Sequence, residues 1–289
     1  MPKYDYSKLQ NGSDIRGVAI GGVSGEIVNL DRETTERLAK GFLYWLSSKT
    51  GKEPASLTIS IGRDPRLSGP DLTDAFCQAL SPYGCRLLNA GLASTPAMFM
   101  STIFEEYKCD GAIMVTASHL PFNRNGLKFF DRGGGLDKGD ITDIITYAES
   151  DSILNSIRGQ TPGEVAEIPL LDTYSAHLRR LIIDGTGLGE KPLTGMKITV
   201  DAGNGSGGFF ATKVLEPLGA DISSSQFLEP DGTFPNHAPN PEDKKAFALA
   251  LELAKEKADA QVITLGKRIL RTETAGLTVL SILMYTLEE

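Results

Sequence analysis

Short apolar runs that end in small or polar residues recur along the chain, and each one predicts a buried strand. The clearest four are SLTISIG (56–62), CRLLNAG (85–91), GAIMVTAS (111–118) and KITVDAG (197–203). Between the runs, apolar residues recur at helical spacing on one face: Leu38, Phe42, Trp45 and Leu46, and then Leu72, Phe76 and Leu80. Strands that alternate with helices predict an α/β fold of layers around a mixed, mainly parallel sheet.

The ends of these elements carry recognisable signals. Asp31 precedes the first helical stripe as a candidate N-cap, and Gly84 follows the second as a candidate C′ residue. In sheets of this kind ligands gather at the carboxyl ends of the strands. Ser118 and Asn204 would both lie at such ends.

The chain predicts two domains joined by a linker. Residues 1–155 form the first domain, and residues 197–289 open a second with a strand, a Gly-rich turn and a helix. Residues 156–196 form the linker, which has a Pro/Gly stretch and an amphipathic helix. Further helical patterns follow in KKAFALALELAKEKADA and in the last 16 residues, with the strand candidate QVITLG between them.

The balance of charged residues limits the partners that the chain can have. It contains 37 acidic and 29 basic residues among 289, a formal charge of −8, which argues against a nucleic acid as the main partner. No apolar run approaches the roughly 20 residues of a membrane span. Three cysteines without a CxxC pair favour a reducing compartment, and we expect a cytoplasmic protein.

The stretch TASHLPFNRNGLKFF (116–130) contains the strongest candidates for chemistry. A phosphoryl carrier needs a nucleophilic oxygen, neighbouring cations and backbone N–H donors in a turn. Ser118 supplies the oxygen, His119 a proton donor or acceptor, and Lys128 a cation that follows an Asn125-Gly126 turn. Each of these residues also has a plain structural interpretation when it is taken alone.

Two arginine motifs strengthen the phosphate hypothesis. SDIRG (13–17) contains Arg16, and GRDPR (62–66) places Arg63 and Arg66 just beyond a strand. An arginine fork binds phosphate through paired charge-assisted hydrogen bonds. The alternative is that these arginines form surface salt bridges with Asp14 or Asp64.

VDAGNGSGG (200–208) is a Gly-rich turn that could cradle a dinucleotide or a phosphate at a helix N-terminus. The acidic residue that a dinucleotide-binding unit needs at the end of its next strand is missing. We therefore favour a structural role for the turn, and for His237 in the loop PDGTFPNHAPNPED (230–243).

The order of these motifs, together with ASTPAM (93–98), resembles the α-D-phosphohexomutases, a family that includes phosphoglucomutase, phosphomannomutase and phosphoglucosamine mutase. The resemblance covers the first domain of that family and most of the second, and it implies three-layer α/β domains. It also implies that Ser118 carries a phosphoryl group that it exchanges with a sugar phosphate. His119 and Lys128 match residues with acid/base or electrostatic roles beside that serine, and Arg16 matches an arginine that faces the phosphoserine. One departure is Leu120, which replaces the asparagine of the usual TASHNP.

The same resemblance implies Mg²⁺ as a cofactor, with Ser118 contributing to the metal site through its phosphate. It also implies a hexose phosphate as substrate and a hexose 1,6-bisphosphate as activator and intermediate. The family's D-x-D-x-D-R loop, which supplies the carboxylate ligands, has no counterpart here. Lys267, Arg268 and Arg271 occur in that region instead, so the carboxylate part of the metal site is absent.

Two hypotheses follow for the chain. The first is a phosphohexomutase-type enzyme that interconverts hexose 1-phosphate and 6-phosphate through a phosphoserine. The second is a non-catalytic truncated remnant that at most binds phosphate or a sugar phosphate. A truncation, a frameshift or deliberate engineering could each explain the residues after 260, and faces that cover other domains in the family could support self-association.

Overall fold

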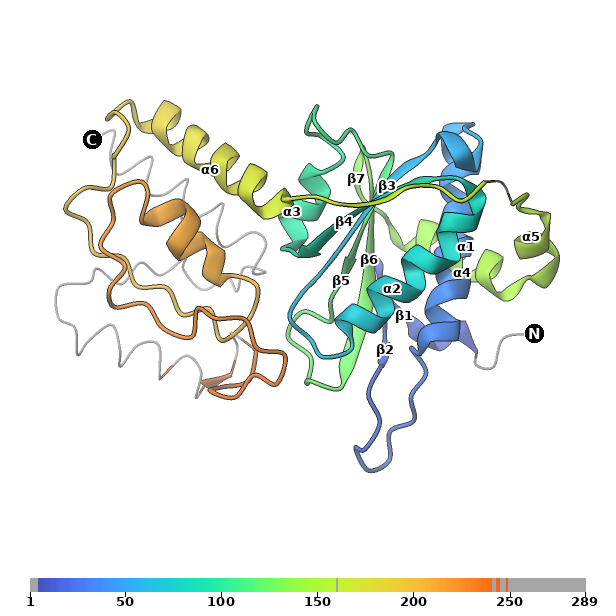
Figure 1. Ribbon diagram of the computed structural model, residues 1–289. Coiled ribbons are helices and arrows are strands. Elements are labelled where there is room, and N and C mark those ends of the chain that lie inside the picture. The colour runs from blue at the N-terminus through green and yellow to red at the C-terminus, as the bar shows by residue number, and fades with distance from the viewer. Residues whose placement is uncertain (1–4, 160, 241–242, 245–247, 249–289) are drawn as a thin grey trace. The chain divides into compact units, whose positions relative to one another are not determined.

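The computed structural model describes residues 5–159, 161–240, 243–244 and 248. The chain divides into two compact units, Met1–Leu170 and Leu171–Glu289 (Figure 1). The second unit thus includes most of a helix that the sequence analysis assigned to the linker. The helix and strand predicted in residues 244–266 and the helix predicted at the end of the chain lie outside the described residues.

A mixed eight-stranded sheet forms the centre of the first unit, as the sequence predicts. Its strands are β1 (Gln10–Asn11), β2 (Asp14–Val18), β3 (Thr58–Arg63), β4 (Arg86–Leu92), β5 (Gly111–Val115), β6 (Arg124–Asp131), β7 (Gly134–Gly135) and β8 (Val165–Glu167). The strand order is β1-β2-β6-β5-β3-β4-β8, and β7 pairs with β6. Strands β5, β3, β4 and β8 are parallel, whereas β1, β2, β6 and β7 are joined by antiparallel pairing.

Helices connect the strands, and their ends follow the capping rules. The helices of this unit are α1 (Arg32–Thr50), α2 (Gly69–Leu80), α3 (Thr95–Met100), α4 (Lys138–Glu149) and α5 (Asp151–Ser156). The carboxylate of Asp31 accepts a hydrogen bond from the Thr34 amide, which confirms it as the N-cap of α1. Gly84 adopts the left-handed conformation that was expected of it, at the end of the short 3-10 helix Ser81–Tyr83 that follows α2.

The two faces of the sheet bury different side chains. Leucine, isoleucine and phenylalanine side chains of β2, β3, β5 and β6 pack with α1, α2 and α4 in the main core. At Gly111 of β5, a Cβ atom would come within 2.8 Å of Phe42 of α1, so the helix lies directly on this face. On the opposite face, a Cβ at Gly62 would come within 2.5 Å of Met98 Sδ of α3.

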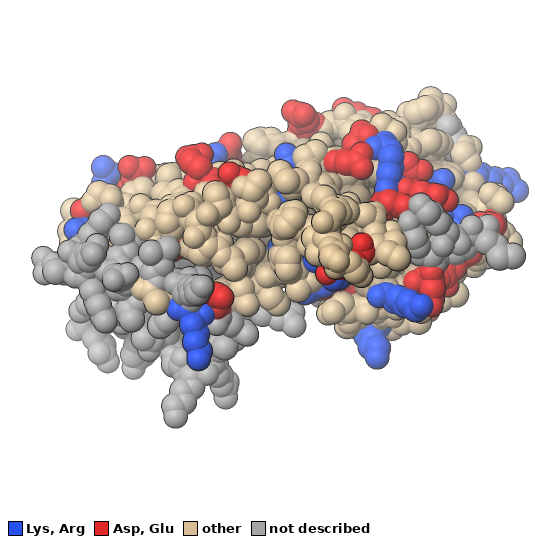
Figure 2. Space-filling view, turned by 90° about the horizontal axis from the view of Figure 1, so that it is seen from below, with Lys and Arg blue, Asp and Glu red and all other residues tan. Residues whose placement is uncertain are grey.

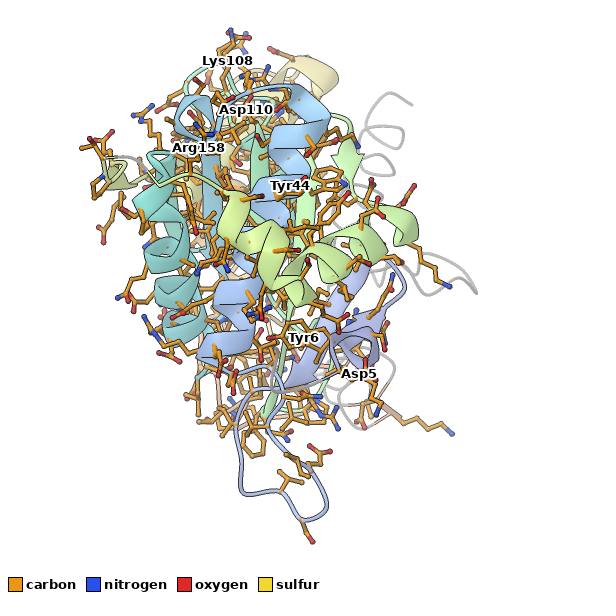
Figure 3. The ribbon with its side chains drawn as sticks, turned by 90° about the vertical axis from the view of Figure 1, so that its right-hand side faces the viewer. Asp5, Tyr6, Tyr44, Lys108, Asp110 and Arg158 are labelled. Atoms are coloured by element: carbon orange, nitrogen blue, oxygen red, sulfur yellow. The ribbon has the colours of Figure 1, made fainter. Side chains whose placement is uncertain are left out.

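Polar contacts hold the first unit together at opposite ends. Tyr6 is 1% exposed, and its amide donates to Glu149 Oε1 at 2.9 Å. Asp110 is also buried, and it forms ion pairs with Lys52 at 2.7 Å and Arg132 at 3.2 Å. Figure 3 shows Tyr6 and Asp110 far apart along the unit.

The second unit has its own apolar interior but less regular strand pairing. Helix α6 (Leu170–Thr186) and the π-helical segment η4 (Phe210–Leu215) bury residues that include Tyr174, Leu178 and Val214. The strand predicted over 197–203 forms only isolated parallel bridges, Lys197 with Asp221 and Asp201 with Gln226. Side chains replace part of the ladder there, since the Val200 amide donates to Ser225 Oγ at 3.0 Å.

Acidic and basic side chains are interspersed over the described part of the face seen in Figure 2. This distribution agrees with the modest net negative charge of the chain.

Candidate functional site

Ser118 lies in the loop between β5 and β6, three residues after the end of β5 at Val115. It is exposed and has a positive φ of 57°, a left-handed conformation that costs an L-residue other than glycine about 1–2 kcal/mol. Its amide donates to Thr116 Oγ1 at 3.0 Å, and its hydroxyl lies 3.4 Å from His119 Nδ1. Its backbone is therefore held in one shape while the hydroxyl faces solvent.

Arg66, which follows β3, is fully buried beneath this loop. Its Nη2 donates to the carbonyl oxygens of Ser118 at 2.8 Å and Leu120 at 2.7 Å. Its Nη1 donates to those of Pro121 at 2.7 Å and Arg124 at 3.0 Å. The surface salt bridge considered for this arginine is thus wrong in one respect: its partner is Asp64, but the pair is buried.

Asp64 completes the network on the inner side. Its carboxylate accepts hydrogen bonds from Arg66 Nε at 3.1 Å, from the Arg66 amide at 3.0 Å and from Thr116 Oγ1 at 2.7 Å. Burial raises the pKa of the Asp64 carboxyl, although its contacts with Arg66 and Thr116 oppose the change. Burial likewise lowers the pKa of the Arg66 guanidinium, which Asp64 opposes, and an arginine remains protonated at neutral pH.

Arg16 and Lys128 share a second buried carboxylate, that of Asp14. Asp14 lies 3.1 Å from Arg16 Nη2 and 3.2 Å from Lys128 Nζ. The antiparallel register of β2 and β6, which pairs Ile15 with Leu127, brings Asp14 opposite Lys128. The ion pair with Asp14 that the sequence left open for Arg16 is present in the structure.

Strand pairing brings these cations and the loop to the same edge of the sheet. The Thr116 amide donates to the Gly126 carbonyl at 3.0 Å, and Gly126 pairs in turn with Arg16. Lys128 pairs with Met114 of β5. No hydrogen bond or ion pair within the described part of the chain joins the Ser118 side chain to Arg16 or Lys128, so a phosphoryl group would have to bridge that space.

The predicted turn at Asn125-Gly126 is wrong, because both residues lie inside β6. Asn125 is fully buried and donates to Ser68 Oγ at 2.9 Å, while its side-chain oxygen accepts from the Gly126 amide. A Cβ at Gly126 would lie 2.3 Å from the Ile15 carbonyl oxygen and 2.8 Å from that of Thr116. The glycine therefore serves the close approach of β2, β6 and β5, not a reversal of the chain.

The loop between β2 and α1 is attached to the far end of the Ser118 loop. Glu26 accepts hydrogen bonds from Asn123 Nδ2 at 2.6 Å and from Arg124 Nη2 at 2.5 Å. The carbonyl oxygen of Asn123 accepts hydrogen bonds from the amides of Ala19 and Ile20. These contacts fix the point at which the Ser118 loop enters β6.

The Gly-rich turn of the second unit binds to its own neighbouring loop. Asn204, with a φ of 59°, donates to the Glu229 carbonyl at 2.9 Å and accepts from Asn236 Nδ2 at 2.7 Å. His237 Nε2 lies 3.1 Å from Asp201 Oδ1, and its Nδ1 lies 2.9 Å from the Ala238 carbonyl oxygen. These contacts agree with the structural role favoured for the turn and for His237.

The two carboxylates described in this site, Asp64 and Asp14, do not fit a magnesium site. Asp64 is engaged by Arg66 and Thr116, and Asp14 is engaged by Arg16 and Lys128. Within the described residues, no group of three or more His, Cys, Asp or Glu side chains is placed to hold a metal ion. The basic segment that contains Lys267 lies outside those residues.

The three cysteines are buried free thiols. Burial raises the pKa of Cys77 and Cys109 to about 11 and that of Cys85 to about 12, so they remain protonated and unreactive at neutral pH. In the described residues, no helix combines the length and the apolar character that crossing a membrane requires.

Comparison with known proteins identifies the family. Residues 7–152 match the sequence model of phosphoglucomutase/phosphomannomutase alpha/beta/alpha domain I, and residues 172–266 match that of domain II. The chain belongs to the phosphoglucomutase/phosphomannomutase family. The loop that holds Ser118 therefore lies within the match to domain I, and the Gly-rich turn lies within the match to domain II.

The chain is similar to a phosphoglucomutase of Neisseria meningitidis, with 35% identity over 67% of this chain and 39% of that protein. It is also 31% identical to a phosphomannomutase/phosphoglucomutase of Pseudomonas syringae, over 68% of this chain and 40% of that protein. A solved phosphoglucomutase/phosphomannomutase family protein from Burkholderia thailandensis superimposes with a TM-score of 0.66 and 25% identity, covering 85% of this chain and 49% of that one. The chain spans about two fifths of the length of these curated relatives.

A third match concerns the end of the chain. Residues 250–284 match the sequence model of an RNA methyltransferase domain, and they overlap the match to domain II at residues 250–266. Residues 267–284 match this model and lie beyond the end of the match to domain II.

Proposed function

We propose that the chain provides the phosphoserine part of a phosphohexomutase, with Ser118 as the residue that carries the phosphoryl group. The observation that supports this proposal most directly is the loop itself. It presents an exposed serine hydroxyl on a backbone that Arg66 fixes from below. Arg16 and Lys128 lie on the neighbouring strands of the same sheet edge.

The reaction would proceed in two transfers. The phosphoryl group passes from Ser118 Oγ to a free hydroxyl of a hexose monophosphate, which gives a hexose 1,6-bisphosphate and an unmodified serine. The other phosphoryl group of the bisphosphate then passes to Ser118 Oγ, and the isomeric monophosphate leaves. His119 would accept or return the proton of the transferring hydroxyl, while Arg16 and Lys128 stabilise charge on the phosphoryl oxygens.

In this proposal the partner is a hexose phosphate, the phosphoryl donor is a hexose 1,6-bisphosphate, and nucleic acids and membranes have no role. The buried thiols and the metabolic substrate favour the cytoplasm.

The magnesium ion that the family implies would neutralise charge on the moving phosphoryl group. The described residues do not fit such an ion beyond the phosphoserine itself, so we derive no step from it. Self-association through faces that cover other domains in longer relatives is part of the same proposal.

A second function is favoured by the engagement of the two carboxylates described in this site. Asp14 and Asp64 are already paired with cations, so the site could bind phosphate or a sugar phosphate without completing a turnover. The Arg16 and Lys128 side chains would then exchange Asp14 for a bound anion. In this alternative the Ser118 loop still binds the anion, but Ser118 does not exchange a phosphoryl group with it.

The test separates phosphoryl exchange from binding. The full chain is incubated with glucose 1,6-bisphosphate and magnesium, and intact mass followed by peptide mapping measures the phosphate adduct. A coupled assay with glucose 1-phosphate and mannose 1-phosphate measures turnover. We expect an adduct at Ser118 and turnover that Ser118→Ala abolishes, whereas Ser48→Ala, at an exposed serine of α1 whose hydroxyl donates to the Tyr44 carbonyl, leaves both in place. An adduct at another residue would exclude Ser118 as the carrier, and phosphate binding without any adduct would favour the second function.

A further inference from the structure

Arg66 uses every donor of its side chain on the surroundings of Ser118. A guanidinium carries five N–H groups in a planar fork. One donates to Asp64, and the four of the two Nη atoms reach the carbonyl oxygens of Ser118, Leu120, Pro121 and Arg124. All five donor–acceptor distances lie between 2.7 and 3.1 Å, so every N–H group of the guanidinium has an acceptor.

The other hydrogen bonds of the loop hold mainly its two ends. The Ser118 amide donates to Thr116 Oγ1, and Asn123 is tied to Glu26, Ala19 and Ile20. Within the loop, the Leu120 amide donates to the Ala117 carbonyl at 3.2 Å, and the Arg124 amide donates to the Pro121 carbonyl at 3.0 Å. Pro121 has no amide hydrogen to contribute. Without Arg66, several inward-facing carbonyl groups would lose their partner, and the left-handed backbone of Ser118 would lose its main support.

The direction of these carbonyl groups determines where the loop amides point. In a trans peptide the C=O and the following N–H point in opposite directions. Since the Ser118 carbonyl points inward to Arg66, the N–H of His119 points outward, and the Pro121 carbonyl sets the N–H of Phe122 in the same way. His119 and Phe122 are exposed, and within the described residues neither amide donates a hydrogen bond. Outward N–H groups beside a serine hydroxyl are free to donate to an anion bound there.

We propose that Arg66 is a positioning residue for the phosphoserine, because it turns the His119 amide outward to donate to a phosphoryl oxygen on Ser118. This inference rests on the proposed function, and it adds a backbone donor to the side chains that the sequence indicates. Arg66 itself touches neither substrate nor phosphate in this role. Its charge is largely balanced by Asp64, so its effect comes from the geometry it imposes.

The experiment compares Arg66→Lys with the wild-type chain. A lysine keeps the positive charge but offers a single ammonium group, which cannot reach four carbonyl groups in a plane. The matched control is Arg86→Lys, because Arg86 is 54% exposed and forms a surface ion pair with Glu164. The rate of amide hydrogen exchange in residues 116–124 measures the local stability of the loop. The exchange rate in α1 measures the stability of the rest of the unit.

We expect Arg66→Lys to speed exchange in 116–124 about tenfold or more, with α1 unchanged, and to lower phosphate occupancy of Ser118 by a similar factor. In the wild type, phosphorylation should shift the His119 amide resonance downfield, and the shift should be lost in the variant. If Arg66→Lys does not fold, Asp64→Asn provides the second test, since it keeps the shape of the side chain and weakens the anchor of Arg66.

The outcomes separate the two proposals. Unchanged exchange and unchanged phosphate occupancy in Arg66→Lys would overturn the positioning role of Arg66. A wild-type chain that takes up no phosphate at Ser118 would overturn the proposed function, while the exchange measurement would still decide whether Arg66 holds the loop. A His119 amide that does not respond to phosphorylation of Ser118 would overturn the backbone donor.

Discussion

Gly126 occupies the point at which β2, β6 and β5 come closest together. A methyl group there would lie 2.3 Å from one backbone carbonyl and 2.8 Å from another, and neither strand can retreat without breaking its ladder. We expect Gly126→Ala to destabilise the first unit by about 1–3 kcal/mol or more, as overpacking does. It should also weaken the placement of Arg16, whose Cγ lies 3.3 Å from the added atom. Thermal or denaturant unfolding measures the loss.

The control for this prediction is Gly21→Ala in the same unit. Its Cβ would meet only Val28 Cγ2, at an ordinary 3.6 Å. We expect its unfolding midpoint to stay near that of the wild type. Equal midpoints for Gly126→Ala and Gly21→Ala would show that the three strands are less tightly packed than the structure indicates.

His237 carries a prediction about pH. Burial lowers its pKa, but the hydrogen bonds to the Ala238 carbonyl and to Asp201 and the charges of Asp201 and Asp243 outweigh this, and the net pKa is raised above 6.5. Both ring nitrogens face acceptors, and only the charged imidazolium donates at both. Since the folded pKa is raised, the contribution to stability is complete below pH 6.5 and is lost as the pH rises through the folded pKa.

We therefore expect the second unit to be less stable at pH 8.5 than at pH 6, by a margin that His237→Gln removes. Thermal melting at a series of pH values measures this difference. His177→Gln, in helix α6 of the same unit, is the control and should leave the pH dependence in place. A His237→Gln profile that follows the wild type at every pH would contradict the charged pair.

Single residues also show where the sequence was sufficient and where it was not. The sequence predicts Ser118, His119, Lys128 and Arg16 as candidates because their residue types suit phosphate chemistry. The contacts of Asp14 with Lys128 and of Arg66 with the Ser118 loop were not predicted, since these partners lie more than 50 positions away in the sequence. The Asp-x-Arg spacing in GRDPR was the available signal for Arg66, but it did not distinguish a buried pair from a surface one.

Helix α4 illustrates stabilisation at the scale of an element. Asp137 accepts from the Asp140 amide, and Asp140 accepts from the Asp137 amide, which forms a reciprocal capping box. We expect Asp137→Ala to destabilise the first unit by about 1 kcal/mol, because an orphan amide of the first turn loses its acceptor. Asp143→Ala, on the exposed face of the same helix, is the matched control, and denaturant unfolding compares the two. If both variants lose the same stability, the box contributes nothing beyond a surface charge.

Elements differed in how well their patterns predicted them. The strands near 58–63, 86–92 and 111–115 follow from continuous apolar runs, because a strand covered on both faces has no alternation to disturb. Strand β6 was missed because Asn-Gly is a strong hairpin signal in isolation. Here the glycine is required because three backbones approach too closely for a Cβ atom, and this approach follows from the fold and not from the local sequence. In the second unit, the run 197–203 is apolar enough for a strand, yet its pairing is limited to single bridges.

The whole chain contains two units that each bury their own apolar residues. Phe42, Leu46 and Phe129 lie in the core of the first, whereas Tyr174, Leu178 and Val214 are buried in the second. Units with separate cores often unfold in separate transitions. The substitutions argued above can assign such transitions, because Gly126 belongs to one unit and His237 to the other.

We expect calorimetry of the full chain to resolve two transitions. Gly126→Ala should lower the midpoint of only one of them, and this midpoint should depend little on the ionisation of His237. The other transition should shift between pH 6 and pH 8.5 in the wild type and lose that shift in His237→Gln. Combining the two substitutions should give the sum of their separate effects, since residues without shared partners behave additively. A single transition that both substitutions move together would instead show that the units fold as one cooperative body, and the Ser118 loop in the first unit would then depend on the integrity of the second.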